Sequence, residues 1–178
     1  GGHNVLEAAA WGVPVISGST GWTERMDEIK KLCAEKNGSF LYASNYSVGV
    51  NIFFEVNKRL AQLMAPHSEY NVSMTEIHHT EKKDAPSGTA ITLAEQILQE
   101  NKRKIKWVNT LSPSDSELLK ENELEIKSKR IDPAPGTHSI TYSSSVDDIE
   151  IIHTAHNRTG FALGAVLAAE FVYTKKGV

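Results

Sequence analysis

The chain has 178 residues, of which 40% are apolar, and its formal net charge at pH 7 is −3. This composition is typical of one globular domain or of two small lobes. A weakly acidic chain gives no reason to expect nucleic acid or an anionic membrane as a partner. No apolar run approaches the ~20 residues that a membrane span needs. The single cysteine, Cys33, cannot form an internal disulfide, which favours a reducing, cytoplasmic compartment.

Both ends of the sequence suggest a piece of a longer protein. The chain has no initiator methionine, begins with Gly1-Gly2-His3 and enters a helical pattern at once. It stops at Gly177-Val178, just past another helical pattern. We therefore expect a fragment from which further segments are missing.

The first 45 residues alternate between helical and strand patterns. The expected elements are a helix over 5–11, a strand over 14–17, a helix over 24–37 and a strand over 39–43. This order predicts a doubly wound sheet with parallel strands. In such a sheet the loops at the carboxyl ends of the strands, here 18–22 and 44–47, line a ligand crevice.

The rest of the chain is richer in strands. The expected elements are helices over 48–64 and 88–101, strands over 70–79, 105–108, 124–130, 138–144 and 149–155, an exposed segment over 111–122 with at most one helical turn, and a final helix over 161–173. The last two strands flank a turn and should form an antiparallel hairpin. The final helix is rich in small residues, so it can pack closely. Strands that follow an α/β beginning predict a second, α+β lobe with a mixed or antiparallel open sheet.

The stretch most informative about chemistry is EIHHTEKKDAPSGTA, residues 76–90. It gathers two histidines, two lysines and an aspartate over residues 78–84 and then opens a helix with Ser87-Gly88-Thr89. A helix N-terminus attracts anions because its first N–H groups lack intrahelical partners and carry partial positive charge. The stretch therefore predicts a site that holds an acidic small molecule and protonates it.

Metal and nucleophile chemistry fit this sequence less well. His78 and His79 are consecutive in a strand pattern, so they should face opposite ways and have separate roles. His153 and His156 have a spacing that could chelate a metal on a helix, but no Cys, Asp or Glu has matching spacing, and no metal site is predicted. Ser87 fits an N-cap better than a nucleophile, because the segment before it lacks the first glycine of a nucleophile elbow.

These residues closely resemble the dihydrodipicolinate reductase family, NAD(P)H-dependent reductases of lysine and diaminopimelate biosynthesis. The matching blocks are GSTGW at 18–22, ASNYSVGVN at 43–51, the stretch 76–90, HTAHNR at 153–158 with FALGA at 161–165, and, more weakly, PGTH at 135–138. The block His-His-x-x-Lys-x-Asp-Ala-Pro-Ser-Gly-Thr is highly specific. Together the blocks cover nearly the whole chain.

The resemblance implies reduction of 4-hydroxy-tetrahydrodipicolinate to tetrahydrodipicolinate with NADPH or NADH as the cofactor. His78 would be the catalytic proton donor and acceptor, and Lys82 the proton donor to the substrate. The small dicarboxylate substrate would contact His79, Gly88 and Thr89. The cofactor would contact Gly18, Ser19, Thr20, Ala43, Ser44, Asn45 and Tyr46. A serine at position 19 replaces the usual threonine, and a tyrosine at position 46 replaces the common phenylalanine.

With the resemblance, the expected fold is α/β with two lobes. A partial Rossmann-like, doubly wound lobe over 1–46 would be completed by the C-terminal helix 157–178. The segment 47–156 would form an α+β lobe with a mixed open sheet, which binds substrate and builds a homotetramer. No Gly-x-Gly-x-x-Gly turn occurs in the chain, so the preference between NADH and NADPH has no determinant here. We expect the fragment itself to be inactive.

Two other functions stay open at the level of sequence. The chain could be a non-catalytic fragment or binding module that keeps the substrate residues without a working cofactor lobe. It could also be a zinc hydrolase that uses His78, His79 and His153, which stoichiometric zinc would reveal.

Overall fold

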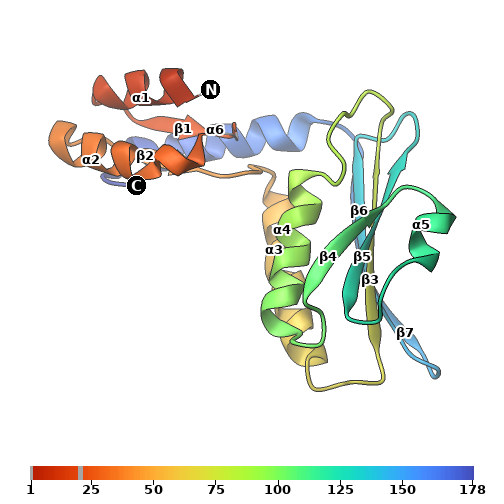
Figure 1. The fold of residues 1–178 in the computed structure, drawn as a ribbon. Coiled ribbons are helices and arrows are strands. Elements are labelled where there is room, and N and C mark those ends of the chain that lie inside the picture. The colour runs from red at the N-terminus through yellow and green to blue at the C-terminus, as the bar shows by residue number, and fades with distance from the viewer. Residues whose placement is uncertain (1, 20–21) are drawn as a thin grey trace. The chain divides into compact units, whose positions relative to one another are not determined.

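The computed structural model describes residues 2–19 and 22–178, and the chain divides into two compact units (Figure 1). The first unit combines Gly1–Val48 with Thr159–Val178, and the second is Gly49–Arg158. Within the described residues, no helix combines the length and the apolar character needed to cross a membrane.

The first unit contains a short parallel pair of strands. Its elements are α1 (Gly2–Ala10), β1 (Val15–Ser17), the 3-10 helix η1 (Thr23–Arg25), α2 (Met26–Lys36), β2 (Phe40–Tyr42) and α6 (Thr159–Tyr173). Its core is built around Trp22, which is 1% exposed and packs edge-on against the rings of Phe40 and Tyr42. The indole N–H donates to the Ser19 carbonyl at 2.7 Å, so burial leaves no polar atom of Trp22 unpaired.

Helix α6 approaches the backbone of the first unit very closely. A Cβ placed on Gly164 would lie 1.7 Å from the Tyr46 carbonyl oxygen, so only glycine fits at this position. Beyond α6, Gly177 forms a parallel bridge to Ser39 beside β2. Of the small residues in this helix, Gly164 is the one that makes the close approach to the backbone.

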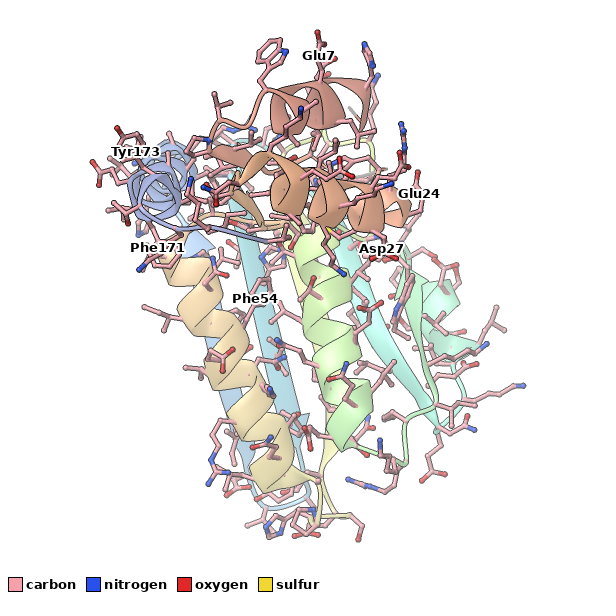
Figure 2. The ribbon with its side chains drawn as sticks, turned by 90° about the vertical axis from the view of Figure 1, so that its left-hand side faces the viewer. Glu7, Glu24, Asp27, Phe54, Phe171 and Tyr173 are labelled. Atoms are coloured by element: carbon pink, nitrogen blue, oxygen red, sulfur yellow. The ribbon has the colours of Figure 1, made fainter. Side chains whose placement is uncertain are left out.

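The second unit is a five-stranded mixed sheet with two helices on one face (Figure 2). Its elements are α3 (Val48–Met64), β3 (Asn71–His78), α4 (Gly88–Glu100), β4 (Lys106–Thr110), α5 (Pro113–Glu117), β5 (Glu123–Arg130), β6 (Gly136–Ser143) and β7 (Asp148–Ala155). The strand order is β4-β5-β3-β6-β7, in which β4, β5 and β3 are parallel and β6 and β7 are antiparallel to their neighbours. The predicted α/β fold with a mixed sheet and the β6–β7 hairpin are confirmed.

On the inner face of this sheet, residues paired across neighbouring strands form successive layers of side chains. Met74 on β3 is paired with Ile126 on β5 and with Ile140 on β6. All three side chains are at most 2% exposed, as are Leu93 and Ile97 on α4. One pleat further along β3, the same alternation places Glu76 on this inner face, and there the core becomes polar.

Two local expectations can be compared with this fold. The segment before β5 does contain one short helix, α5, which begins with a capping box between Ser112 and Asp115. His153 lies on strand β7, as the strand expected over 149–155 required, so His153 and His156 are not on a helix where their spacing could chelate a metal. A spacing of three residues alone does not distinguish a helix from a strand followed by a turn.

Candidate active site

The polar layer of the sheet follows directly from strand register. Glu76 on β3 is paired with Ser128 on β5 and with His138 on β6. The last residue of β3, His78, is paired with Arg130. Because paired residues on one face of a sheet have adjacent side chains, these five residues are brought together by strand pairing alone.

Glu76 lies at the centre of this layer and its side chain is fully buried. Its Oε1 accepts hydrogen bonds from the Ser128 hydroxyl at 2.8 Å and from Nη2 of Arg130 at 3.1 Å. Its Oε2 accepts from the Ser87 N–H at 3.1 Å and lies 3.3 Å from Nδ1 of His78. Burial raises the pKa of this carboxyl, but the donors on His78, Ser87 and Ser128 outweigh burial and hold it well below its usual range. Glu76 is therefore a buried negative charge.

The two histidines of the cluster have different environments. His138 is 5% exposed, and burial, together with the neighbouring His78, lowers its pKa from 6.5 to about 3, so its ring is neutral near pH 7. Its Nε2 lies 3.1 Å from the Ser87 hydroxyl oxygen. The His78 ring is edge-on to it, with 5.2 Å between ring centroids. Nδ1 of His78 has the Glu76 carboxylate as its nearest charged neighbour and makes no directed hydrogen bond.

Lys82 lies in the loop between β3 and α4, and a carboxylate already holds it. Its ammonium group donates to both oxygens of Asp84, at 2.8 and 2.9 Å. This hydrogen bond is the main reason that the pKa of Asp84 is lowered. The Lys82 side chain is 22% exposed, and its neighbour Lys83 is more fully exposed to solvent. The loop therefore presents one half-buried cation beside the histidines.

The start of α4 has the geometry expected of an anion-binding helix end. Ser87 is the N-cap, and its hydroxyl accepts from the Ala90 N–H at 3.2 Å, which confirms the N-cap prediction. Gly88 is exposed, and a Cβ placed on it would meet no atom within 4 Å. Thr89 and His79 are half-buried. The space beside Gly88 thus leaves the first turn of α4 open to a ligand.

The residues predicted for the cofactor follow the two parallel strands of the first unit. Gly18 and Ser19 follow β1, and residues 43–46 follow β2. The two loops meet, because a Cβ on Gly18 would lie 3.3 Å from the Tyr46 ring. The Tyr46 hydroxyl donates to the carbonyls of Ser17 at 3.1 Å and of Leu41 at 2.8 Å, so the extra oxygen of this tyrosine is accommodated. Thr20 lies outside the described residues.

Sequence reasoning did not assign a role to Glu76, Ser128, Arg130 or His138. One signal was available for the first of these. Val72, Met74, Glu76 and His78 share one parity along β3, so a carboxylate had to face the same side as the buried core and the predicted catalytic histidine. The other three depend on pairing between distant strands, which a single sequence does not reveal.

The cluster also offers metal donors. Within the described part of the chain, Glu76, His78 and His138 form the one group of three His, Cys, Asp or Glu side chains whose ligand atoms all lie within 4.8 Å of one another. His79 and His153, named in the zinc-hydrolase hypothesis, do not belong to it. Arg130 already neutralises Glu76 at 3.1 Å, so a second cation at this carboxylate would be repelled. The absence of a metal site stays a prediction.

The sequence of this chain is similar to those of known proteins. Residues 49–178 match the family model "Dihydrodipicolinate reductase, C-terminus". A 4-hydroxy-tetrahydrodipicolinate reductase from Christiangramia forsetii is 47% identical over 175 residues, covering 98% of this chain and 70% of that protein. One from Methanococcus vannielii is 39% identical, covering 95% of this chain and 62% of that protein. The chain thus spans about two thirds of the length of these relatives.

A solved structure shares the fold. The dipicolinate-bound dihydrodipicolinate reductase from a Paenisporosarcina species superposes with a TM-score of 0.71 at 23% identity, over 99% of this chain and 68% of that one. The chain is therefore an α/β protein whose mixed-sheet fold is shared with this reductase. More narrowly, the family model and the relatives show that the chain belongs to the dihydrodipicolinate reductase family.

The cluster predicts an acid-sensitive fold. A histidine whose pKa is lowered from 6.5 to about 3 binds more protons unfolded than folded between these values, so stability falls as pH drops through that window. The lowered pKa of Glu76 adds a further loss below its ordinary value of 4.5. We expect His138→Gln to flatten the decline in melting temperature between about pH 6.5 and 4.5, whatever its effect at neutral pH. Calorimetry of both proteins across this range checks it, and parallel curves would contradict it.

Proposed function

We propose that this chain carries the substrate site of an NAD(P)H-dependent reduction of 4-hydroxy-tetrahydrodipicolinate to tetrahydrodipicolinate, a step of lysine and diaminopimelate biosynthesis. The observation that carries the proposal is the convergence of three features in one unit. These are a histidine beside a buried carboxylate, a half-buried lysine in the next loop, and an open helix N-terminus. Family membership supports the same reaction.

The open helix end suits a dicarboxylate substrate. The N–H groups at Gly88 and Thr89 and the positive end of the α4 dipole would hold one carboxylate. His79, half-buried at the end of β3, would contact the same molecule. The Paenisporosarcina relative is described as dipicolinate-bound, and dipicolinate is a planar dicarboxylate of the same class.

His78 and Lys82 would manage the protons. Lys82 would offset negative charge as it develops on the substrate and donate a proton, and His78 would donate and accept protons beside it. The nearby Glu76 carboxylate favours a proton on Nδ1 of His78, which leaves Nε2 for exchange with substrate. Both residues belong to the segment that leads from β3 into α4. One short stretch of chain would therefore supply the proton donors and the helix N-terminus that binds the substrate carboxylate.

The cofactor side would lie in the first unit, which we propose is the remainder of a Rossmann-like lobe. The loops after β1 and β2 meet at the carboxyl ends of parallel strands, which is where dinucleotides bind in such sheets. When bound, NADPH or NADH supplies the hydride. The chain's own contribution there would come from Gly18, Ser19, Thr20 and residues 43–46.

Kinetics of four variants test the roles of the loop residues. In the complete gene product, His78→Gln and Lys82→Ala should each lower kcat by roughly 10²- to 10⁴-fold, because they act in proton transfer. Lys83→Ala is the matched control and should change kcat little, since Lys83 is exposed. Thr89→Val should act mainly on KM, because it removes a ground-state contact. Nicotinamide oxidation with 4-hydroxy-tetrahydrodipicolinate measures all four. No turnover by the wild-type protein, or a crippled Lys83→Ala beside an active Lys82→Ala, would contradict the proposal.

A substitution at Gly88 tests whether the start of α4 binds the substrate carboxylate, and it should leave the fold intact. Gly88→Ala adds a methyl group to open space and replaces glycine in a helix, so thermal stability should be unchanged or slightly raised. The same methyl group would occupy the space proposed for the substrate carboxylate. We therefore expect roughly 10-fold weaker dipicolinate binding in calorimetry, about 1.4 kcal/mol. Equal affinity of the variant and the wild-type protein would place the carboxylate site elsewhere.

We also propose that the second unit builds a homotetramer. The edge strand β7 carries Ile149 and Ile152, which are 37% and 57% exposed, and an open apolar edge favours association. Light scattering of the complete gene product at micromolar concentration should give four times the monomer mass. A monomeric mass would rule this assembly out.

A further inference from the structure

We propose that Glu76 and Arg130 are a positioning pair for the active site: together they orient His78 and hold the loop of Lys82 and the start of α4 in one arrangement. The inference rests on the proposed function and adds to it two residues to which the resemblance assigned no role. Neither side chain needs to touch the substrate for this role.

The two oxygens of Glu76 have different partners: Oε1 is bonded to strand β5, and Oε2 faces Ser87 and His78. Oε1 is fixed by Ser128 at 2.8 Å and by Arg130 at 3.1 Å, both on β5. That leaves Oε2 turned toward the Ser87 N–H at 3.1 Å and Nδ1 of His78 at 3.3 Å. One carboxylate thus joins the residue before α4 to the predicted catalytic histidine.

Arg130 connects the same carboxylate to the lysine loop. Its Nη2 donates to Glu76 and also to the Asp84 carbonyl at 2.6 Å, and its Nε donates to the Lys82 carbonyl at 3.3 Å. A guanidinium is planar and has donors in a fixed fork, so these bonds define where the loop backbone lies. Lysine at this position could keep the charge but not the fork.

The pair sets which nitrogen of His78 carries a proton. A carboxylate beside Nδ1 favours the form protonated there, and Nε2 is then the atom that exchanges a proton with the substrate. Nε2 lies beside Gly136, where an added Cβ would be only 3.2 Å away. This arrangement resembles the general logic in which a buried acid orients a histidine whose other nitrogen reacts.

Stability alone is a weak explanation for the pair. Replacing a buried ion pair by packed apolar residues is often neutral or stabilising. The preceding layer of the same sheet is apolar, with Met74 between Ile126 and Ile140. The charged layer occurs only where β3 approaches the catalytic segment, so we assign its charge to the site.

The decisive variant is Glu76→Gln in the complete gene product. It keeps the size of the side chain but removes the charge and one acceptor. We expect kcat to fall roughly 10²-fold, as for loss of a proton-transfer group, while dipicolinate affinity changes less than about 3-fold. Arg130→Lys should lower kcat by a smaller factor, because charge is retained and the fork is lost.

Glu125→Gln is the matched control. Glu125 lies on β5, is 12% exposed, and accepts hydrogen bonds from Thr110 and Ser116, so it is a nearly buried, bonded carboxylate in the same sheet. Its carboxylate contacts Thr110, Ser116 and Lys127, all of which lie outside the segment 76–90. Its loss should lower the melting temperature and leave kcat and KM unchanged.

A spectroscopic measurement separates positioning from structure. With ¹⁵N-labelled histidine, and the His78 signals assigned through His78→Gln, the wild-type protein should show His78 protonated at Nδ1. Glu76→Gln should lose that preference, and Glu125→Gln should keep it. If Glu76→Gln fails to fold, Ser128→Ala removes one of the bonds that fix Oε1 and should shift the same signals in the same direction.

The outcomes distinguish the two proposals. Equal kcat for Glu76→Gln and Glu125→Gln, or an unchanged His78 signal, would overturn the positioning role while leaving the reductase function intact. A wild-type protein that lacks turnover but shows the Glu76-dependent His78 signal would overturn the function and leave the positioning of His78 standing.

Discussion

The second unit is organised around one buried negative charge. The cost of taking a carboxylate out of water is several kcal/mol, so Glu76 is tolerable only because three hydrogen-bond donors and the His78 ring surround it. The donors come from β5 and from the residue before α4, and the His78 ring lies at the end of β3. Satisfying the charge therefore requires the sheet, the helix start and the histidine to be in place together. The geometry of the site is a consequence of that requirement.

Strand register gives the charge its position. The pairing that stacks Met74, Ile126 and Ile140 also stacks Glu76, Ser128 and His138 one pleat later. A slip of one residue in β3 would turn the carboxylate to the opposite face, away from its partners. The apolar layer and the polar layer thus specify the same register, one through packing and the other through hydrogen bonding.

Much of the fold was predictable because its signals are local. Period-2 alternation indicated β3, the apolar stripe from Ala90 to Ile97 indicated α4, and Ser87 was recognised as its cap. Proline and glycine marked several boundaries. The site was predictable only along one segment, residues 76–90, because that segment is continuous in sequence. His138 and Arg130 reach the site through antiparallel and parallel pairing across the sheet, and no pattern in a single sequence encodes which strands pair. The strand expected over 149–155 was a local signal of the same kind, and His153 lies on β7 as that signal predicted.

The ion pair between Lys82 and Asp84 has a consequence for selectivity. Both oxygens of Asp84 already accept hydrogen bonds from the Lys82 ammonium group. An incoming anion must therefore displace the Asp84 carboxylate, which the chain holds beside Lys82 at a high effective concentration. A molecule with a single weak charge would compete poorly with Asp84 for Lys82. A molecule that also binds at the start of α4 would gain a second contact and could displace Asp84 from Lys82. At the substrate site proposed above, the Lys82–Asp84 ion pair would therefore favour ligands with two separated negative groups over small monoanions.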